Sequence, residues 1–532
     1  MSAQGPTPGA VPPSAVPGAV PPSAVPGAVP PSAVPGAVPP SAVPGAPRLR
    51  RWAVLGVVLA VLVGFGVVDR GVARPPEAPA PAVAASVAAP VGSQSSTWYC
   101  AGGSGTAGGM AQATLLVTNT GPDPVTGEVG VVNDAGATAS SVLRVPARSE
   151  VTVSPSAVEQ GTWLAATVRL GGGGVVVSQV GQGPAGWSQS ACASTALPDW
   201  YFASGSTAQG STLVLDLYNP MATPAVVDTT FVTARGPVQP QPDEGVVVEP
   251  GQLVAIDVGT YVQDEQHVST IVSARSGQVV AEQLQTLSLN GQQGLSLRLG
   301  AAAPRTAWSL PRTVDPAGVA TELSVLNPGT QAETVTVSVR LASAGAKFAA
   351  RVAPFVVRVP PESTWHLRTD SASRIPPSTD FALSVRSTGG SGVVVDRTVT
   401  VPPAGASPRW GVTPAIGRAG AGRAGAYRWV LPAPGAAVAG AVPSALAVQN
   451  LTRSAVTVRV RALVGGQVKN LGSAGTFRLG PRAFAVIGQP VLAGVSGTDP
   501  LMVESNGSLA VVEELSPAGA PGVVAVAGVP LG

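Results

Sequence analysis

Short segments in which apolar and polar residues alternate follow one another from about residue 97 to the C-terminus. The clearest are TVTVSVRL at residues 334–341 and VTVRVRAL at residues 456–463, in which every second residue is apolar. Because successive side chains of a β-strand point to opposite faces, this period of two predicts strands with one buried and one exposed face. Gly, Pro and Asn separate the segments, as turn residues separate strands. The pattern predicts an all-β fold.

Landmark residues recur four times in this region, in the same order and at similar spacing. Four tryptophans open the copies: Trp98, Trp200, Trp308 and Trp429. About twenty residues later an alternating strand ends at an asparagine: Asn119, Asn219, Asn327 and Asn450. A proline between two further strands follows in each copy: Pro146, Pro250, Pro360 and Pro481. A valine-rich strand completes each series. This regularity indicates a fourfold internal repeat.

Each copy has the length and strand content of an immunoglobulin-like β-sandwich, for which about a hundred residues and seven strands are typical. The sequence therefore predicts a tandem array of four such repeats, with these boundaries: 97–196, 197–303, 304–425 and 426–532. The four tryptophans are expected to be buried repeat anchors, and the four asparagines to end strands and cap turns. A β-propeller is the alternative, although the two halves of a copy do not resemble each other.

The N-terminal part has a different composition and predicts three further segments. Residues 8–43 are four identical copies of PGAVPPSAV without charged or aromatic residues, so residues 1–47 are expected to be a disordered tail. Residues 52–68 are uncharged and mostly apolar, and at ~1.5 Å per residue they reach ~25 Å, the short end of a membrane span. They predict a transmembrane signal anchor within residues 48–70, followed by an Ala/Pro linker at residues 71–96.

Arginines are more numerous before the predicted span than after it, which favours an N-terminus in the cytoplasm and an extracytoplasmic C-terminal part. A cleaved signal peptide is one alternative, and a buried core helix is another. The expected location is the cytoplasmic membrane, crossed once.

Cys100 and Cys192 are the only cysteines, and both lie in the first copy, beyond the predicted anchor. Cys100 falls in the first predicted strand and Cys192 near the last, so a disulfide would tie these two strands together. Paired cysteines in that position are typical of an oxidising compartment. Two free buried thiols are the alternative.

The sequence offers few residues for chemistry. Charged residues make up 11% and the net charge is +3, too small for a nucleic-acid-binding protein. The two histidines, His267 and His366, fall in different copies, so neither a paired-histidine metal site nor a catalytic role is expected. Residues 181–186 match GxGxxG, but no helix follows, which indicates a loop. We assign no catalytic residue, metal ligand or cofactor, and predict that the protein is not an enzyme; a hydrolase with paired carboxylates is a further hypothesis.

The stretch WYCAGG, together with the second cysteine in SACAS, resembles an actinobacterial family known as domain of unknown function 5719. The matching residues are Trp98, Tyr99, Cys100, Gly102, Gly103 and Cys192. The resemblance implies a single-pass anchored protein of the cell envelope, with an extracytoplasmic part at about residues 90–532, and it transfers no catalytic residue.

These observations predict a structural or protein-interaction protein of the cell envelope, held in the membrane by residues 52–68. Its expected partner is an unidentified envelope protein. The alternative is a module that binds cell-wall polysaccharide through exposed aromatic side chains. The tryptophans outside the repeat positions include Trp163, Trp187, Trp365 and Trp410, which are better candidates for such contacts than the repeat anchors.

Overall fold

The structure is a computed structural model. It describes residues 85–532 except 107, 241–244, 290–291, 315–319, 342–351, 377–379, 402–408, 415, 418–426, 489–490 and 517–523. The predicted tail, the predicted anchor and most of the predicted linker lie outside these residues. The described part belongs to one compact unit. Its helices are single 3-10 turns, and none of them has the length and apolar character needed to cross a membrane.

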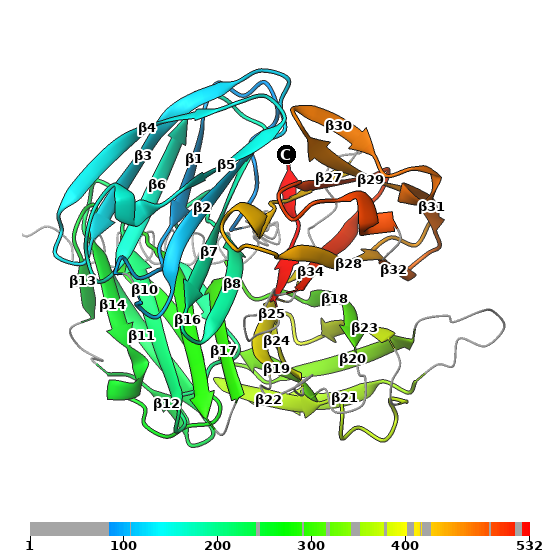
Figure 1. The fold of residues 1–532 in the computed structure, drawn as a ribbon. Helices are drawn as coiled ribbons and strands as arrows, with labels where there is room; N and C mark the ends of the chain where they lie inside the picture. Colours follow the sequence, from blue (N-terminus) through cyan, green and yellow to red (C-terminus); the bar gives the residue numbers. More distant parts are fainter. Residues whose placement is uncertain are drawn as a thin grey trace, which may run out of the picture. The chain divides into compact units, whose positions relative to one another are not determined.

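The described strands form sheets that group into four consecutive pairs along the chain (Figure 1). In each pair, the Trp sheet contains the strand of the repeat tryptophan, and the Asn sheet contains the strand that ends at or next to the repeat asparagine. All pairings within a sheet pair are antiparallel. The all-β prediction is confirmed.

The strands of the first two pairs have the following bounds. The first Trp sheet has the order β1 (Ser96–Cys100), β6 (Leu164–Leu170), β3 (Val125–Asn133) and β4 (Thr138–Val145). The first Asn sheet has the order β5 (Ser149–Val153), β2 (Gln112–Asn119), β7 (Val175–Gly183) and β8 (Gly186–Ala191). The second Trp sheet has the order β12 (Gly236–Val238), β11 (Ala225–Thr233), β15 (Ser269–Ser276) and β9 (Asp199–Phe202), with β13 (Val246–Val248) also on β11. The second Asn sheet has the order β14 (Leu253–Asp257), β10 (Ser211–Tyr218), β16 (Val280–Leu289) and β17 (Gln292–Leu299).

The third and fourth pairs repeat this plan. The third Trp sheet has the order β21 (Phe355–Val359), β20 (Glu333–Leu341), β23 (Asp380–Ser387), β18 (Ala307–Val314) and β26 (Ile416–Gly417). The third Asn sheet has the order β25 (Arg409–Pro414), β24 (Val394–Val401), β19 (Ala320–Asn327) and β22 (Ser363–Arg368). A parallel pairing of β17 with β25 joins it to the second Asn sheet, so that the two form one eight-stranded sheet. The fourth Trp sheet has the order β30 (Gln467–Asn470), β29 (Val456–Val464), β33 (Leu501–Ser505), β27 (Tyr427–Leu431) and β36 (Val529–Leu531), with β31 (Thr476–Leu479) also on β29. The fourth Asn sheet has the order β32 (Phe484–Ile487), β28 (Val442–Asn450), β34 (Leu509–Ser516) and β35 (Val524–Ala527).

Five single 3-10 turns lie between these strands in the described residues: η1 (Pro155–Ala157), η2 (Val258–Thr260), η3 (Pro434–Ala436), η4 (Ser473–Gly475) and η5 (Val491–Gly494).

The strand order within a sheet pair differs from that of an immunoglobulin constant domain. In the first pair the opening strand β1 lies beside the sixth strand, β6. In the immunoglobulin arrangement the first strand lies beside the second. The sheets are packed as sandwiches, because the buried side chains of both sheets share one apolar cluster, but the immunoglobulin-like order is not confirmed.

The four sheet pairs contact one another in a closed cycle. The last strand of each Asn sheet contacts its counterpart in the next pair: β8 contacts β17, β17 contacts β25, β25 contacts β35, and β35 contacts β8. The first and fourth pairs are also joined by the backbone of Ala88. Its N–H donates to Pro530 O at 2.9 Å, and its carbonyl accepts from Gly532 N at 2.9 Å. The predicted tandem array is therefore joined end to end, with the first pair beside the fourth.

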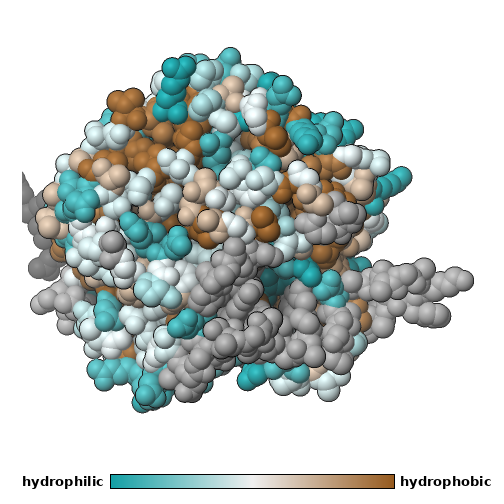
Figure 2. Space-filling view, in the orientation of Figure 1, coloured by the Kyte–Doolittle hydropathy of each residue, from teal (hydrophilic) through white to brown (hydrophobic). Residues whose placement is uncertain are grey.

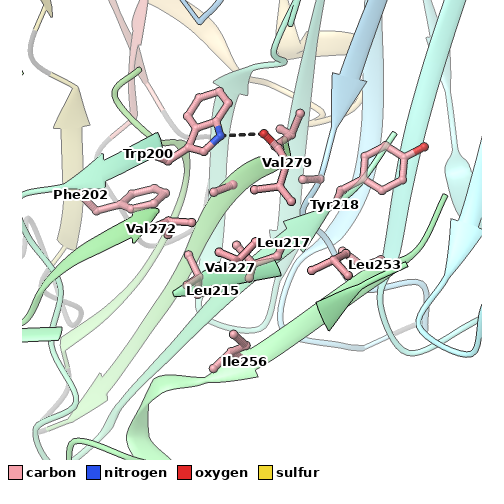
Figure 3. Close-up of a cluster of buried hydrophobic side chains, with 14 of the residues drawn as sticks. Trp200, Phe202, Leu215, Leu217, Tyr218, Val227, Leu253, Ile256, Val272 and Val279 are labelled. Atoms are coloured by element: carbon pink, nitrogen blue, oxygen red, sulfur yellow. Dashed lines mark hydrogen bonds between the residues drawn. The ribbon is translucent and has the colours of Figure 1, made fainter. Parts of the chain in front are cut away.

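The repeat tryptophans are buried inside their sheet pairs. Trp98 and Trp200 are 0% exposed, Trp308 is 5% exposed and Trp429 is 8% exposed. The indole N–H of Trp200 donates to Val279 O of the facing sheet at 2.8 Å, amid the apolar cluster of the second pair (Figure 3). A repeat anchor in this position packs the core and leaves no ring face free for a sugar.

The four repeat asparagines cap their turns in the same way. Asn119 Oδ1 accepts from Gly121 N at 2.8 Å, and Nδ2 donates to Asp123 O at 2.8 Å and, on the facing sheet, to Pro146 O at 3.0 Å. Asn219, Asn327 and Asn450 repeat both turn bonds and are likewise 0% exposed. Their bonds to the facing sheet go to Val248 O, Pro360 O and Gly480 O, respectively. Because the turn and the opposite sheet depend on one amide group, each asparagine caps a turn as predicted.

The cysteines form a disulfide in the structure. Cys100 ends β1 and Cys192 follows β8, with their Cα atoms 4.8 Å apart. The bond connects the Trp sheet to the end of the Asn sheet in the first pair, as the sequence predicted.

Candidate functional sites at the junctions between sheet pairs

Equivalent strands of the Asn sheets place polar residues where neighbouring sheet pairs meet. Two adjacent positions on these strands are occupied in turn by Ser178 and Gln179, Glu282 and Gln283, Asp396 and Arg397, and Val512 and Glu513. Seven of these side chains are buried, and the side chain of Asp396 is 15% exposed. Charged residues make up only 11% of the chain, yet several of them lie at these positions. A charged side chain that is removed from water is costly unless a group of opposite charge pairs with it or a proton transfer makes it neutral.

The junction between the first and second pairs holds two facing carboxyl groups. Asp216 lies directly opposite Glu282, and both are 0% exposed. Gln179 of the first pair donates its side-chain amide to Glu282, as do the backbone N–H groups of Ala101 and Gly102. Burial raises the pKa of Glu282 to about 8. Burial and the charge of Glu282 raise the pKa of Asp216. With a pKa of about 8, Glu282 is mostly a neutral acid at pH 7.

The junction between the fourth and first pairs has the same character. Glu150 Oε2 accepts from Thr118 Oγ1 at 2.6 Å and from Ala433 N of the fourth pair at 3.1 Å. Burial raises the pKa of Glu150 to about 8 despite these bonds. Glu513 is 2% exposed. Burial and the charge of Glu150 raise the pKa of Glu513 to about 8.

The junction between the second and third pairs contains an ion pair instead. Asp396 Oδ2 accepts from Arg298 Nη1 at 2.6 Å, from Ala203 N at 2.7 Å and from Ser204 N at 3.0 Å. The guanidinium of Arg298 also lies 5.5 Å from the ring centre of Phe202. Burial lowers the pKa of Arg298, and Asp396 opposes that shift. Two backbone N–H groups and one guanidinium thus donate to a single carboxylate oxygen, and hydrogen bonds to charged groups of this kind are strong.

Arginines also mark the junction between the third and fourth pairs. Arg312 forms ion pairs with Glu514 of the fourth pair and, at 3.5 Å, with Asp380 of its own pair. Arg397 is 3% exposed and donates to the backbone oxygen of Arg312. Burial lowers the pKa of Arg397 to about 10, and the charge of Glu514 opposes that shift.

The two histidines meet at the junction between the second and third pairs. His267 precedes β15 of the second pair, and His366 lies on β22 of the third. Glu322 Oε1 on β19 is 2.8 Å from His267 Nε2 and 3.3 Å from His366 Nδ1. The imidazole centres are 4.0 Å apart, and Ser324 Oγ lies 3.1 Å from His366 Nδ1. Two imidazoles and one carboxylate thus converge on a single point.

This His–Glu–His cluster is partly accessible and its electrostatics are coupled. The side chains of His267, Glu322 and His366 are 43%, 23% and 24% exposed. Burial raises the pKa of Glu322, but hydrogen bonds with both histidines outweigh burial and lower it to about 2. The hydrogen bond to Glu322 raises the pKa of His267. The carboxylate is ionised at neutral pH and attracts a proton or another cation to the imidazoles.

The expectation that the histidines lie apart because they belong to different copies is wrong. Strand β22 presents His366 and β19 presents Glu322 on the face of the third Asn sheet that meets the second pair. A repeat-by-repeat comparison of the sequence cannot find this cluster, because its residues come from non-equivalent positions of two copies. The useful signal was that the only two histidines of the chain occur in consecutive copies.

The outer face of the first Trp sheet is hollowed. Two adjacent depressions of ≈ 590 and ≈ 390 Å³ share Glu128, Ser140 and Arg169. Val142 lines the larger one and is 88% exposed. Figure 2 shows hydrophobic residues gathered at the upper left of the view, where Figure 1 draws β3 and β4.

The remaining candidate residues from the sequence are spread over several environments. Trp187 is 0% exposed and Trp163 and Trp365 are partly buried, so none of them is a fully exposed aromatic platform. The side chain of Trp410 lies outside the described residues. Residues 181–186 span the end of β7, a turn at 184–185 and the start of β8, so the motif lies in a β-hairpin and no helix follows it.

Residues 173–364 match the model of DUF5719, a family of unknown function. The resemblance drawn from the sequence is confirmed over these residues, which hold Cys192, the complete second pair and the His–Glu–His cluster except for His366. None of the curated proteins compared with the chain matches it. A solved structure titled "Crystal Structure of Thermotoga maritima 1070" is similar with 16% identity, over 22% of this chain and 97% of that chain, at a TM-score of 0.19. A similarity at that TM-score carries no argument about the fold or function of this chain.

Proposed function

We propose that the chain is a membrane-tethered, extracytoplasmic structural and protein-interaction protein of the cell envelope. The observation that carries the proposal is the closed cycle of four sheet pairs, which are joined by hydrogen-bonded junctions and by the Ala88 contact with the last strand. Such an assembly presents several fixed surfaces from one attachment point. The disulfide between Cys100 and Cys192 supports an oxidising location, and residues 52–68 supply the proposed tether.

The hollowed face of the first Trp sheet is the surface we assign to the partner. It combines exposed apolar surface at Val142 with one acidic and one basic side chain, Glu128 and Arg169. Protein interfaces combine an apolar centre with polar groups in this way. A polysaccharide site would instead be expected to offer exposed aromatic rings, which the described residues do not gather on this face.

The location is tested by fractionating cells that express the full chain. We expect the protein to sediment with membranes, and the Leu59→Arg/Leu62→Arg double variant to lose that association because charges in a span are costly. Thiol labelling of unreduced protein should leave Cys100 and Cys192 unmodified. Soluble wild-type protein that begins after residue 70 would contradict the tether.

The interaction surface is tested by crosslinking in cells. We expect Val142→Glu and Arg169→Glu to abolish crosslinks to an envelope protein, whereas Val356→Glu on the third pair, where Val356 is 65% exposed, leaves them intact. Retention of the purified chain on wall polysaccharide, unaffected by these substitutions, would replace this proposal with the polysaccharide-binding function.

A further inference from the structure

The His–Glu–His cluster has the composition of a transition-metal site. Imidazole nitrogen and carboxylate oxygen together suit Zn²⁺ and similar first-row ions, whereas Ca²⁺ and Mg²⁺ prefer oxygen ligands alone. Two histidines and one glutamate are also the ligand set of known zinc sites that keep one coordination position open. No other group of three His, Cys, Asp or Glu residues with converging ligand atoms occurs in the described part of the chain.

The distances in the cluster are close to those that a metal ion needs. A tetrahedral ion about 2.0–2.2 Å from its ligands holds the ligand atoms about 3.3–3.5 Å from one another. Glu322 Oε1 lies 2.8 Å from His267 Nε2 and 3.3 Å from His366 Nδ1. One ligand atom from each residue lies within 4.8 Å of both others. Small side-chain rotations that move the ligand atoms by up to about an ångström would place all three atoms at bonding distance from one ion.

The backbone positions of the ligands are fixed independently of any ion. Glu322 and Ser324 lie two residues apart on β19, and His366 is paired with Ser324 across β19 and β22. The loop of His267 is fixed to its own pair by Val268 N, which donates to Gly205 O at 2.9 Å. Ser269 Oγ also lies 2.7 Å from Thr364 Oγ1, which joins the two pairs close to the cluster. The ligands are therefore presented together before an ion arrives.

We propose that His267, Glu322 and His366 bind a divalent transition-metal ion, with Zn²⁺ as the representative ion, and that this ion fastens the second sheet pair to the third. The ion replaces the shared hydrogen bonds of Glu322 with coordinate bonds to all three side chains. One ligand comes from the second pair and two from the third, so the ion acts as a cross-link between pairs. The partial exposure of the three side chains provides access from solvent and leaves a coordination position for water.

The test uses the full chain, purified in detergent without a histidine tag and stripped with a chelator. Titration with Zn²⁺ followed by calorimetry and metal analysis is expected to give one ion per chain. We expect His267→Gln, Glu322→Gln and His366→Gln to weaken Zn²⁺ binding at least tenfold each. Asp370→Asn, which alters a neighbouring exposed ion pair with Arg368, serves as the matched control and should bind Zn²⁺ like the wild type.

Two further readouts separate loss of the site from loss of folding. In chelator, the three glutamine variants should melt within a few degrees of the wild type, because their side chains are partly exposed. Zn²⁺ should raise the melting temperature of the wild type but not of these variants, and should slow hydrogen exchange at Val268 and Ser269. The absence of stoichiometric Zn²⁺ binding by the wild type would overturn the proposal, as would binding that survives all three substitutions.

Discussion

The junctions that flank the first sheet pair and those that flank the third differ in the neighbours of their buried carboxyl groups. Around the first pair, Glu282 faces Asp216, and Glu513 interacts with Glu150. Burial raises the pKa of both glutamates, and the charge of Glu150 adds to the rise at Glu513. Around the third pair, Asp396 and Glu514 face arginines. Burial raises the pKa of Glu514, and the charges of Arg312 and Arg397 oppose that rise. The buried acids around the first pair gain charge as the pH rises. The difference indicates that one half of the cycle is sensitive to pH and the other depends on matched partners.

The largest effect is expected when one member of the third pair's ion pairs is removed. Asp396→Ala leaves the guanidinium of Arg298 buried without its carboxylate, and Arg298 is 8% exposed. Breaking a buried pair in this way costs about 3–5 kcal/mol, to be measured by denaturant unfolding. The double variant Arg298→Met/Asp396→Leu should recover most of that loss, and a double variant no more stable than Asp396→Ala would contradict the ion-pair explanation.

The disulfide is expected to stabilise the first pair, which the acidic junctions flank. Reduction, or the Cys192→Ser substitution, opens a loop with a sequence separation of 92 residues and should cost about 2–5 kcal/mol. The loss should be concentrated in the first pair, as judged by hydrogen exchange of β1 and β8. Equal loss of protection in the third pair would show that the cycle unfolds as one cooperative unit.

The acidic junctions predict a pH dependence with a definite sign. Glu150, Glu282 and Glu513 have pKa values of about 8 in the folded protein, against an ordinary value near 4.5. Between these values the unfolded chain releases protons that the folded chain keeps, so stability is fully present below about pH 4.5 and falls as the pH rises to about 8. The melting temperature should therefore be lower at pH 8 than at pH 5.

Glu282→Gln sharpens this test at a single position. The amide keeps the size of the side chain but carries no titrating proton, and its NH₂ group can donate to Asp216. We expect the variant to be more stable than the wild type at pH 8 by about 1–2 kcal/mol and to show a shallower pH slope. Asp396→Asn at the equivalent position is the matched comparison and should instead be destabilising at both pH values.

The smallest effect is expected at a surface ion pair outside the junctions. Arg368 pairs with Asp370 at 2.7 Å, and the arginine side chain is 57% exposed. Exposed pairs contribute about 0–1 kcal/mol, so Arg368→Gln should hardly change the unfolding midpoint. A loss as large as that of Asp396→Ala would remove the distinction between buried junctions and the solvated surface.

The sequence predicts the interior of a sheet pair well because the interior is repeated. Period-two alternation identifies the strands, and the fourfold recurrence of tryptophan and asparagine marks residues whose roles are the same in every copy. Trp200 and Asn219 could be assigned as a buried anchor and a turn cap from position alone. The same logic does not establish the immunoglobulin-like order, because the alternation of a strand specifies which face is buried and not which strand lies beside it.

The junctions could not be predicted in the same way. Glu282 follows three apolar residues, Val279, Val280 and Ala281, which marks it as a charge in a buried strand. Its neighbours, however, come from another copy and differ at every junction. The His–Glu–His cluster illustrates this most clearly, since His267 and His366 are distant in sequence and meet only because consecutive sheet pairs pack side by side.

The contact of Ala88 with the last strand also has a mechanical consequence. A pull on the chain before Ala88 is transmitted through two backbone hydrogen bonds to β36, which is itself paired with β27. Tension along the proposed tether would therefore act on the fourth pair as well as on the first. The two hydrogen bonds of Ala88 would be the first to break. Once these bonds have broken, the force would act on the junction between the fourth and first pairs, where Glu150 and Glu513 lie.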